Sequence, residues 1–231
     1  MKIMIINPNS SHDMTAIMQK VAEDYGQERF NVIVKNIPSG PPFIETYEDQ
    51  AVVAQEMLNL VREHEDEYDA FIVACHSDPN LDLLKEATEK VVVGIGEASM
   101  KMASILGHSF SVVATDLHSV PNKEALVRRY HLENLCVSVK APCAEQNYLS
   151  EEDKIIKTAK RAIKEDLAEV IVLGCAGYGG LDKIVSDEVN APVLDGVVCA
   201  LMIAEGFVRY GVTTSKIRRY KPVSLGLLSH S

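Results

Sequence analysis

The amino-acid sequence repeats itself at an offset of 100 residues, and this repeat constrains the fold more than any other feature. Asp69–Cys75 (DAFIVAC) aligns without a gap with Glu169–Cys175 (EVIVLGC), and a glycine follows each cysteine 21 positions later, at Gly96 and Gly196. Further matches pair Leu81 with Leu181, Asp82 with Asp182, Val93 with Val193 and Met102 with Met202. Shared secondary structure alone could explain the apolar matches, but the cysteine and glycine spacing favours two related halves.

Short apolar runs alternate with stretches of helical periodicity along the whole chain. In one such stretch, apolar residues recur at i, i+3, i+4 and i+7 from Met14 to Val21, which predicts a helix with one buried face. Runs such as Phe71–Ala74 and Ile171–Leu173 are apolar at every position, as is typical of strands covered on both faces. The predicted strands are residues 2–6, 31–36, 70–74, 91–94, 110–114, 136–140, 170–174 and 192–194. This alternation indicates an α/β fold with parallel sheets.

The repeat and the strand pattern together predict two pseudo-symmetric lobes. Each lobe would hold a mostly parallel four-stranded sheet flanked by helices, with the active site in the cleft between the lobes. We assign residues 1–97 to the first lobe, with 208–231 returning to it, and residues 98–207 to the second. A chain of 231 residues amounts to about one and a half domains at ~150 residues each, which two small lobes would explain.

The charge balance limits the possible partners. The chain has 33 acidic and 23 basic residues and a net charge of −10, so it repels the phosphate backbone of nucleic acids and anionic membranes. No apolar run approaches the ~18 residues of a membrane span. The apolar run after Lys2 is also too short for a signal peptide. We therefore expect a small-molecule ligand, no nucleic-acid or membrane partner, and a cytoplasmic location.

The five cysteines lie far apart and lack the CxxC spacing of zinc or thioredoxin sites. They are typical of free thiols in a reducing compartment. Cys136, Cys143 and Cys199 have no counterpart in the repeat, and we expect them to be structural. Cys75 and Cys175 occupy equivalent positions in the repeat and are the candidates for chemistry.

Cys75 and Cys175 both follow the carboxyl end of a predicted strand, where ligands bind in open parallel sheets. Ser77-Asp78-Pro79 supplies N-cap candidates and a proline suited to start a helix. The glycine-rich segment Ala176–Gly180 allows backbone N–H groups to face an anion or an enolate oxygen. A thiol at a helix N-terminus has a pKa below the usual ~8.5. The alternative interpretation is that both cysteines are small buried apolar residues.

Two thiols on opposite walls of a cleft suit the inversion of a stereocentre. One thiolate would remove a proton from a carbon acid, and the other thiol would deliver a proton to the opposite face. The two groups would titrate as a coupled pair. This chemistry needs no cofactor and no metal.

Motifs spread over most of the chain carry a family resemblance. They are Asn7–Ser10 (NPNS), Gly40–Glu45 (GPPFIE), Ala74–Pro79 (ACHSDP), Val93–Ala98 (VGIGEA) and Leu173–Gly177 (LGCAG). Together they resemble the hydantoin and allantoin racemase branch of the aspartate/glutamate racemase superfamily. The resemblance implies two α/β lobes, cofactor-independent racemisation by Cys75 and Cys175, and a homo-oligomer. It also implies that the following residues line the substrate pocket: Asn9, Phe43, Ile44, Ser77, Thr115, Ala176 and Gly177.

Several of these candidates have a structural alternative. Asn9 and Ser10 end the first strand and either bind a ring amide of the substrate or cap the next helix, for which Ser11 is also suited. Thr115 ends a strand in the second half and either binds ligand or caps a helix. His76 either lines the pocket or has a surface or structural role. Glu45 is expected in a salt bridge or a loop hydrogen bond rather than as a base.

The substrate that the motifs favour is a hydantoin-like cyclic ureide, either allantoin or a 5-substituted hydantoin. Its C5–H would lie between the thiols, and its C4 carbonyl would delocalise the carbanion into an enolate. The motifs offer amides, hydroxyls and glycines rather than arginine or lysine, which suits a neutral ring. An aspartate- or glutamate-type amino-acid racemase is the alternative. A two-lobed protein that binds or senses a small molecule is a different class that the residues leave open.

Overall fold

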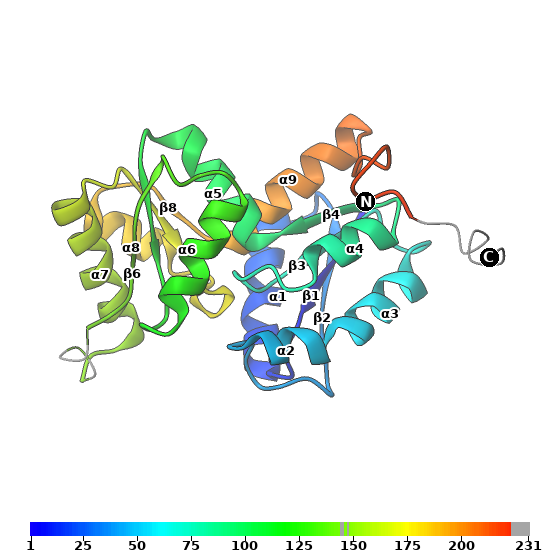
Figure 1. Ribbon diagram of the computed structural model, residues 1–231, viewed down its shortest axis with the longest axis horizontal. Helices are drawn as coiled ribbons and strands as arrows, with labels where there is room; N and C mark the ends of the chain where they lie inside the picture. Colours follow the sequence, from blue (N-terminus) through cyan, green and yellow to red (C-terminus); the bar gives the residue numbers. More distant parts are fainter. Residues whose placement is uncertain (144–145, 147, 223–231) are drawn as a thin grey trace, which may run out of the picture.

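The computed structural model describes residues 1–143, 146 and 148–222. Their strands form two four-stranded parallel sheets, which Figure 1 shows side by side. The first sheet has the order β2-β1-β3-β4 and the second the order β6-β5-β7-β8. The two orders are identical when β1 to β4 are matched with β5 to β8. The predicted α/β fold with two related sheets is confirmed.

The strands are β1 (Lys2–Asn7), β2 (Asn31–Asn36), β3 (Ala70–Val73), β4 (Val91–Gly94), β5 (Phe110–Val113), β6 (Cys136–Lys140), β7 (Val170–Leu173) and β8 (Val193–Leu194). The helices are α1 (His12–Gly26), α2 (Tyr47–Val52), α3 (Ala54–His64), α4 (Leu81–Ala87), α5 (Ile95–Leu106), α6 (Ser119–Arg129), α7 (Glu151–Asp166), α8 (Asp182–Val189) and α9 (Gly196–Tyr210), with a 3-10 turn η2 (Ala176–Tyr178). All eight predicted strands are present, and each end lies within one residue of its predicted position.

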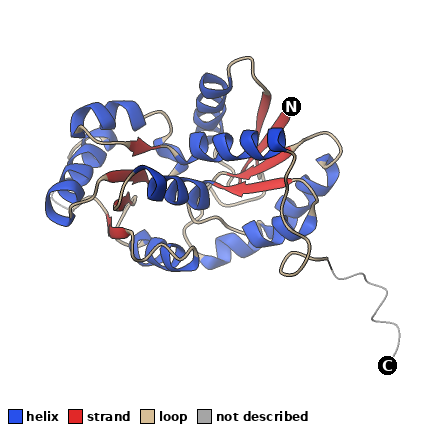
Figure 2. Ribbon diagram, turned by 90° about the horizontal axis from the view of Figure 1, so that it is seen from above, coloured by secondary structure: helices blue, strands red, loops and turns tan. Residues whose placement is uncertain are grey.

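Helices cover both faces of each sheet, as the continuous apolar runs predict (Figure 2). In the first sheet, Ile3 and Ile5 pack towards α1 and α9, whereas Met4 and Ile6 pack towards α3 and α4. Neighbouring residues of a strand point to opposite faces, so both sets must be apolar. The second sheet repeats the arrangement, with α7 and α8 on one face and α5 and α6 on the other.

Helices α5 and α9 pack against each other where the two sheets meet, and each directly follows the last strand of its half (Figure 1). Gly196 at the start of α9 lies so close to Ile95 that an added Cβ would be 3.1 Å from the Ile95 Cβ. Helix α5 contributes Ile95 and Ala98 to the core of the first sheet, and Met100 and Ala103 to that of the second. The two helices therefore link the halves.

Helix α9 differs from its predicted placement. We assigned residues up to 207 to the second lobe, but Val197, Ala200, Leu201 and Ala204 pack in the core of the first sheet. The chain thus returns to the first sheet as soon as β8 ends, because the apolar face of α9 covers β3 and β4. The end of the predicted return, residues 223–231, lies outside the described residues. Within the described residues, no helix is long and apolar enough to cross a membrane.

Candidate active site

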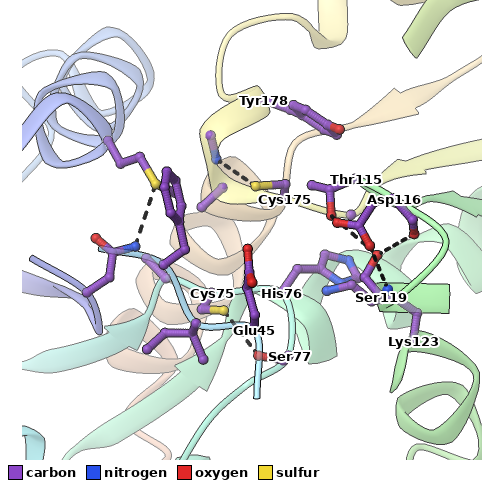
Figure 3. Close-up of a pocket in the computed structure, with 18 of the residues that line it drawn as sticks. Glu45, Cys75, His76, Ser77, Thr115, Asp116, Ser119, Lys123, Cys175 and Tyr178 are labelled. Carbon is purple, nitrogen blue, oxygen red and sulfur yellow. Dashed lines mark hydrogen bonds between the residues drawn. The ribbon is translucent and has the colours of Figure 1, made fainter. Parts of the chain in front are cut away.

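A cavity of about 440 Å³ opens between the carboxyl ends of the two sheets and contains both cysteines. Its volume lies in the range of small-molecule sites. Figure 3 shows Cys75 and Cys175 on opposite sides of this cavity, on the segments that follow β3 and β7. The topology explains why the two cysteines line the same cavity, because β3 and β7 occupy the same place in the two sheets.

Cys75 lies in a tight turn that begins two residues after β3 ends. Its Sγ is 3.1 Å from the Ser77 hydroxyl, and the Asp78 amide donates to its carbonyl oxygen at 2.9 Å. Asp78 has a positive φ of 47°, which L residues other than asparagine and aspartate rarely adopt. The turn thus holds the Cys75 thiol at the cavity wall.

Asp78 caps a different helix from the one that we predicted. Helix α4 begins after Asn80, without a side-chain cap, whereas the Asp78 carboxylate accepts hydrogen bonds from the backbone amides of Gly96 at 3.0 Å and Glu97 at 2.6 Å, at the start of α5. Tyr130 also donates to it at 2.5 Å. Burial raises the pKa of Asp78 to about 6 in spite of these hydrogen bonds. The carboxyl group therefore ties the Cys75 turn to α5.

Cys175 is held by the short turn η2. The Gly177 amide donates to its Sγ at 3.3 Å, and the Tyr178 amide to its carbonyl oxygen at 3.2 Å. We expected the turn to lower the pKa of this thiol, but burial raises it, and the opposing effects of Gly177 and Lys123 are smaller. The hydrogen bond from the Gly177 amide to the sulfur lowers the pKa of the thiol, but by less than burial raises it.

Asp195 has the role in the second half that Asp78 has in the first. Its carboxylate caps α9 by accepting from Val197 at 2.7 Å, and it also accepts from the Gly180 amide at 3.0 Å. Gly180 ends the segment that carries Cys175. Each half therefore uses one buried carboxyl group to join its cysteine segment to a helix, which is α5 in the first half and α9 in the second. Burial raises the pKa of Asp195 as well.

His76 is buried at the edge of the cavity, with 1% of its surface exposed. Its Nε2 is 3.2 Å from the Ser99 hydroxyl, which donates to the Ile95 carbonyl at 2.7 Å. The single Ser99 hydroxyl proton is used for Ile95, which favours the tautomer with the proton on Nε2 and leaves Nδ1 as an acceptor that has no partner among the described residues. Burial and the charge of Lys123 lower the pKa of His76 well below 6.5, so the ring is neutral at pH 7.

Lys123 is the site residue that the motifs did not predict. It lies on α6, lines the cavity and is only 7% exposed. The motifs themselves offer no lysine or arginine, but the cavity contains this lysine from a segment outside them. A signal was present in the sequence, because Lys123 precedes the buried Leu126 and Val127 by three and four residues and so lies on the apolar face of its helix.

Most of the other predicted pocket residues line the cavity, namely Asn9, Phe43, Ile44, Ser77, Thr115, Ala176 and Gly177. Ser10 does not, because its backbone amide donates to the Pro41 carbonyl at 2.9 Å and the chain has turned away from the cavity. Ser11 caps α1 by accepting from Met14. Asp116, rather than Thr115, accepts from the Ser119 amide at the start of α6, so the Thr115 hydroxyl is not a helix cap.

The remaining charged groups of the cavity are acidic. Asp13, Glu45, Asp116 and Glu151 line it together with Lys123. Figure 3 shows Asp116 and Lys123 on the same side, next to Ser119. The other cysteines, Cys136, Cys143 and Cys199, are not among the residues that line it. No three histidine, cysteine or acidic side chains of the described part of the chain are grouped in a way that could hold a metal ion.

Comparison with known proteins places the chain in a family. A model of the Asp/Glu/Hydantoin racemase family matches residues 3–204. The chain belongs to this family. The hydantoin racemase of Paenarthrobacter aurescens is 36% identical over 228 residues, which are 96% of this chain and 97% of that protein. The hydantoin racemase of Rhizobium meliloti is 35% identical, over 95% of this chain and 94% of that protein.

Solved structures agree with the family assignment. The allantoin racemase of Pseudomonas fluorescens is similar with a TM-score of 0.89 at 32% identity, over 97% of this chain and 99% of that one. An aspartate racemase homologue of Pyrococcus horikoshii, at 15% identity and a TM-score of 0.68, shares the fold. The resemblance of the sequence motifs to the Asp/Glu/Hydantoin racemase family is thus confirmed.

Proposed function

We propose that this protein is a racemase that inverts the C5 stereocentre of a hydantoin-like cyclic ureide, with Cys75 and Cys175 as the two bases. The observation that carries the proposal is the placement of two thiols, from equivalent strand ends, on opposite sides of one cavity. Proton exchange on the two faces of one carbon requires this arrangement. The relatives named hydantoin racemase and allantoin racemase support the substrate class.

The proposed reaction consists of two proton transfers. One cysteine thiolate takes the C5 proton, so an S–H bond forms while the C–H electron pair moves into the ring and makes an enolate at the C4 oxygen. The thiol of the other cysteine then gives its proton to the opposite face of C5 and becomes the thiolate. The substrate leaves with inverted C5, and the protein has exchanged which sulfur carries the proton. No oxidant, cofactor or metal enters the balance.

The charges of the cavity favour a neutral ring over the alternative substrate, aspartate or glutamate. Such an amino acid brings two carboxylates, which need cationic partners. The described residues that line the cavity include one lysine and no arginine, but four carboxyl side chains: Asp13, Glu45, Asp116 and Glu151. The two carboxylates of such a substrate would be repelled there, and its one ammonium group offsets only one of these charges. A cyclic ureide has amide groups and no formal charge.

The test is to incubate the pure protein in deuterium oxide with each enantiomer of allantoin, of 5-substituted hydantoins, of aspartate and of glutamate. Optical rotation reports inversion, and proton NMR reports exchange of the C–H hydrogen, each against a control without protein. We expect inversion and exchange for a ureide. Exchange of the amino acids alone would support the alternative substrate, whereas binding of a ureide without exchange would support a sensing protein and contradict the racemase.

A further inference from the structure

We propose that Lys123 is the counter-ion of the single negative charge that crosses the cavity during racemisation, and that its ammonium group contacts the substrate oxygen that carries this charge between the two proton transfers. This inference rests on the proposed function and adds one catalytic residue to it.

The charge count of the reaction calls for such a cation. At rest, one cysteine is a thiolate and the other a thiol. After the first transfer both sulfurs are protonated and the charge is on the enolate oxygen. After the second transfer the charge is on the other sulfur. The two sulfurs and the substrate therefore carry one negative charge between them at every stage, and a cation that faces both sulfurs can stabilise it throughout.

Lys123 has the position that this role requires. A thiolate at either Cys75 or Cys175, which come from opposite halves of the structure, raises the pKa of its ammonium group. It lines the same cavity as both sulfurs, and it is the one lysine or arginine among the described lining residues. Burial lowers the pKa of Lys123, and negative charge on either cysteine, on Asp78 or on Asp116 opposes this effect.

The two aspartates that face Lys123 have other donors. The Asp78 carboxylate accepts from Gly96, Glu97 and Tyr130. The Asp116 carboxylate accepts from the Ser119 amide at 2.9 Å and the Thr115 hydroxyl at 2.9 Å. Neither carboxylate depends on Lys123 for its hydrogen bonds, which leaves the ammonium group available to a charge inside the cavity.

Two other groups near the sulfurs, the Gly177 amide and His76, are poorly suited to hold an enolate oxygen. The Gly177 amide donates to the Cys175 sulfur. His76 is neutral, its Nε2 proton is directed to Ser99, and its Nδ1 is an acceptor. The negative groups at the cavity wall, such as Asp116 and Glu45, repel an enolate. Lys123 is thus the cationic donor that the cavity offers for the developing charge.

The test compares Lys123→Met, which removes the charge and keeps an apolar chain, with Lys123→Arg, which keeps the charge. Arg128→Met, on the exposed side of the same helix, is the matched control for loss of one positive charge. Each variant is assayed for kcat/KM with the ureide that the wild type racemises. Without substrate, the rate of iodoacetamide alkylation at pH 7 is measured for the Cys75 and Cys175 peptides by mass spectrometry. Thermal unfolding reports whether the variants fold.

For Lys123→Met we expect kcat/KM to fall by about 10²- to 10³-fold, the usual cost of one lost oxyanion donor. We expect alkylation of the more reactive of the two cysteines to slow roughly tenfold or more, because a neighbouring cation favours the thiolate. The acidic limb of the kcat/KM profile should move to higher pH by about one unit or more. Lys123→Arg should keep the alkylation rate, and Arg128→Met should match the wild type in both assays.

A folded Lys123→Met protein with wild-type kcat/KM overturns the inference, and so does a folded Lys123→Met protein whose cysteines react as fast as those of the wild type. If methionine is not tolerated at this position, Lys123→Gln is measured with the same two deciding outcomes. A wild-type protein that exchanges none of the compounds refutes the proposed function instead. The alkylation rates then still show whether Lys123 stabilises a thiolate.

Discussion

The hydroxyl group of Tyr130 donates a hydrogen bond of 2.5 Å to the buried carboxyl group of Asp78. This bond joins the turn that follows Cys75 to the end of helix α6, the helix that carries Lys123. The same carboxyl group accepts hydrogen bonds from the first amides of α5. One side chain therefore connects three segments around the cavity, and its protonation state affects all three.

The first prediction concerns the pH dependence of stability. An unfolded aspartate loses its proton near pH 4, whereas the folded-state pKa of Asp78 is about 6. Between these values the folded protein binds the proton more tightly, so this group makes stability fall as pH rises through the window, by roughly 3 kcal/mol in total. Asp78→Asn cannot ionise and should lack this fall. Urea unfolding of both proteins at pH 4.5 and pH 7 measures it, and identical pH profiles would contradict the prediction.

The second prediction concerns the close approach of Asp78 to β4. A Cβ at Gly94 would be 2.2 Å from the nearer Asp78 oxygen, so Gly94→Ala should displace the carboxyl group and destabilise the fold by about 2 kcal/mol or more. Gly206→Ala is the matched control, because a Cβ there meets no atom within 4 Å and alanine in a helix interior should stabilise it by roughly 0.5–1 kcal/mol. Chemical unfolding measures both. Equal stability of the two variants would show that Asp78 moves without cost.

The third prediction concerns His76. Its ring should remain neutral, with the proton on Nε2, at pH 7 and at pH 6, because burial and Lys123 lower its pKa well below 6.5 and the Ser99 hydroxyl accepts from Nε2. Nitrogen-15 NMR distinguishes the two tautomers and the protonated ring by the chemical shifts of the two ring nitrogens. A protonated ring at pH 6 would mean that water reaches the histidine, and a proton on Nδ1 would mean that the Ser99 contact is reversed.

The fourth prediction distinguishes Cys75 and Cys175 from the three cysteines outside the cavity. A serine hydroxyl is far too weak an acid to exchange protons as a thiol does near neutral pH, so Cys75→Ser and Cys175→Ser should each lower the racemisation rate by at least about 10³-fold. Thermal unfolding should change little, because serine is close to cysteine in size and both side chains lie at the cavity wall. Cys136→Ser, outside the cavity, is the control and should keep full activity. If Cys75→Ser or Cys175→Ser is as active as this control, the substituted cysteine takes no part in proton transfer.

Local patterns in the sequence were sufficient to predict the strands and the equivalent positions of Cys75 and Cys175 in the two halves. Runs such as Ala70–Val73 and Val170–Leu173 are apolar on both faces, and a cysteine that follows each run at the same spacing must lie at the same sheet edge. The family motifs added the loop around Phe43 and Ile44, which lines the cavity although it is distant in sequence from both cysteines.

The features that the sequence did not reveal depend on contacts between distant segments. Asp78 caps α5 rather than α4 because the turn after Cys75 brings it to Gly96, 18 residues further on. Burial, which raises the pKa of Cys175, depends on the packing of the second half around the thiol. Lys123 was missed because a lysine on a helix is normally an exposed residue, and only the cavity shows what it faces.

The placement of helix α9 has a consequence for the order in which the protein folds during synthesis. Strands β3 and β4 are complete by residue 94, but the helix that covers one of their faces begins at residue 196, so it leaves the ribosome after the strands of the second sheet. The second sheet and its helices, residues 95–194, are made in between as one continuous stretch. The first sheet therefore cannot complete its core until the second has been synthesised, and the usual order of folding from the N-terminus is reversed for its final step.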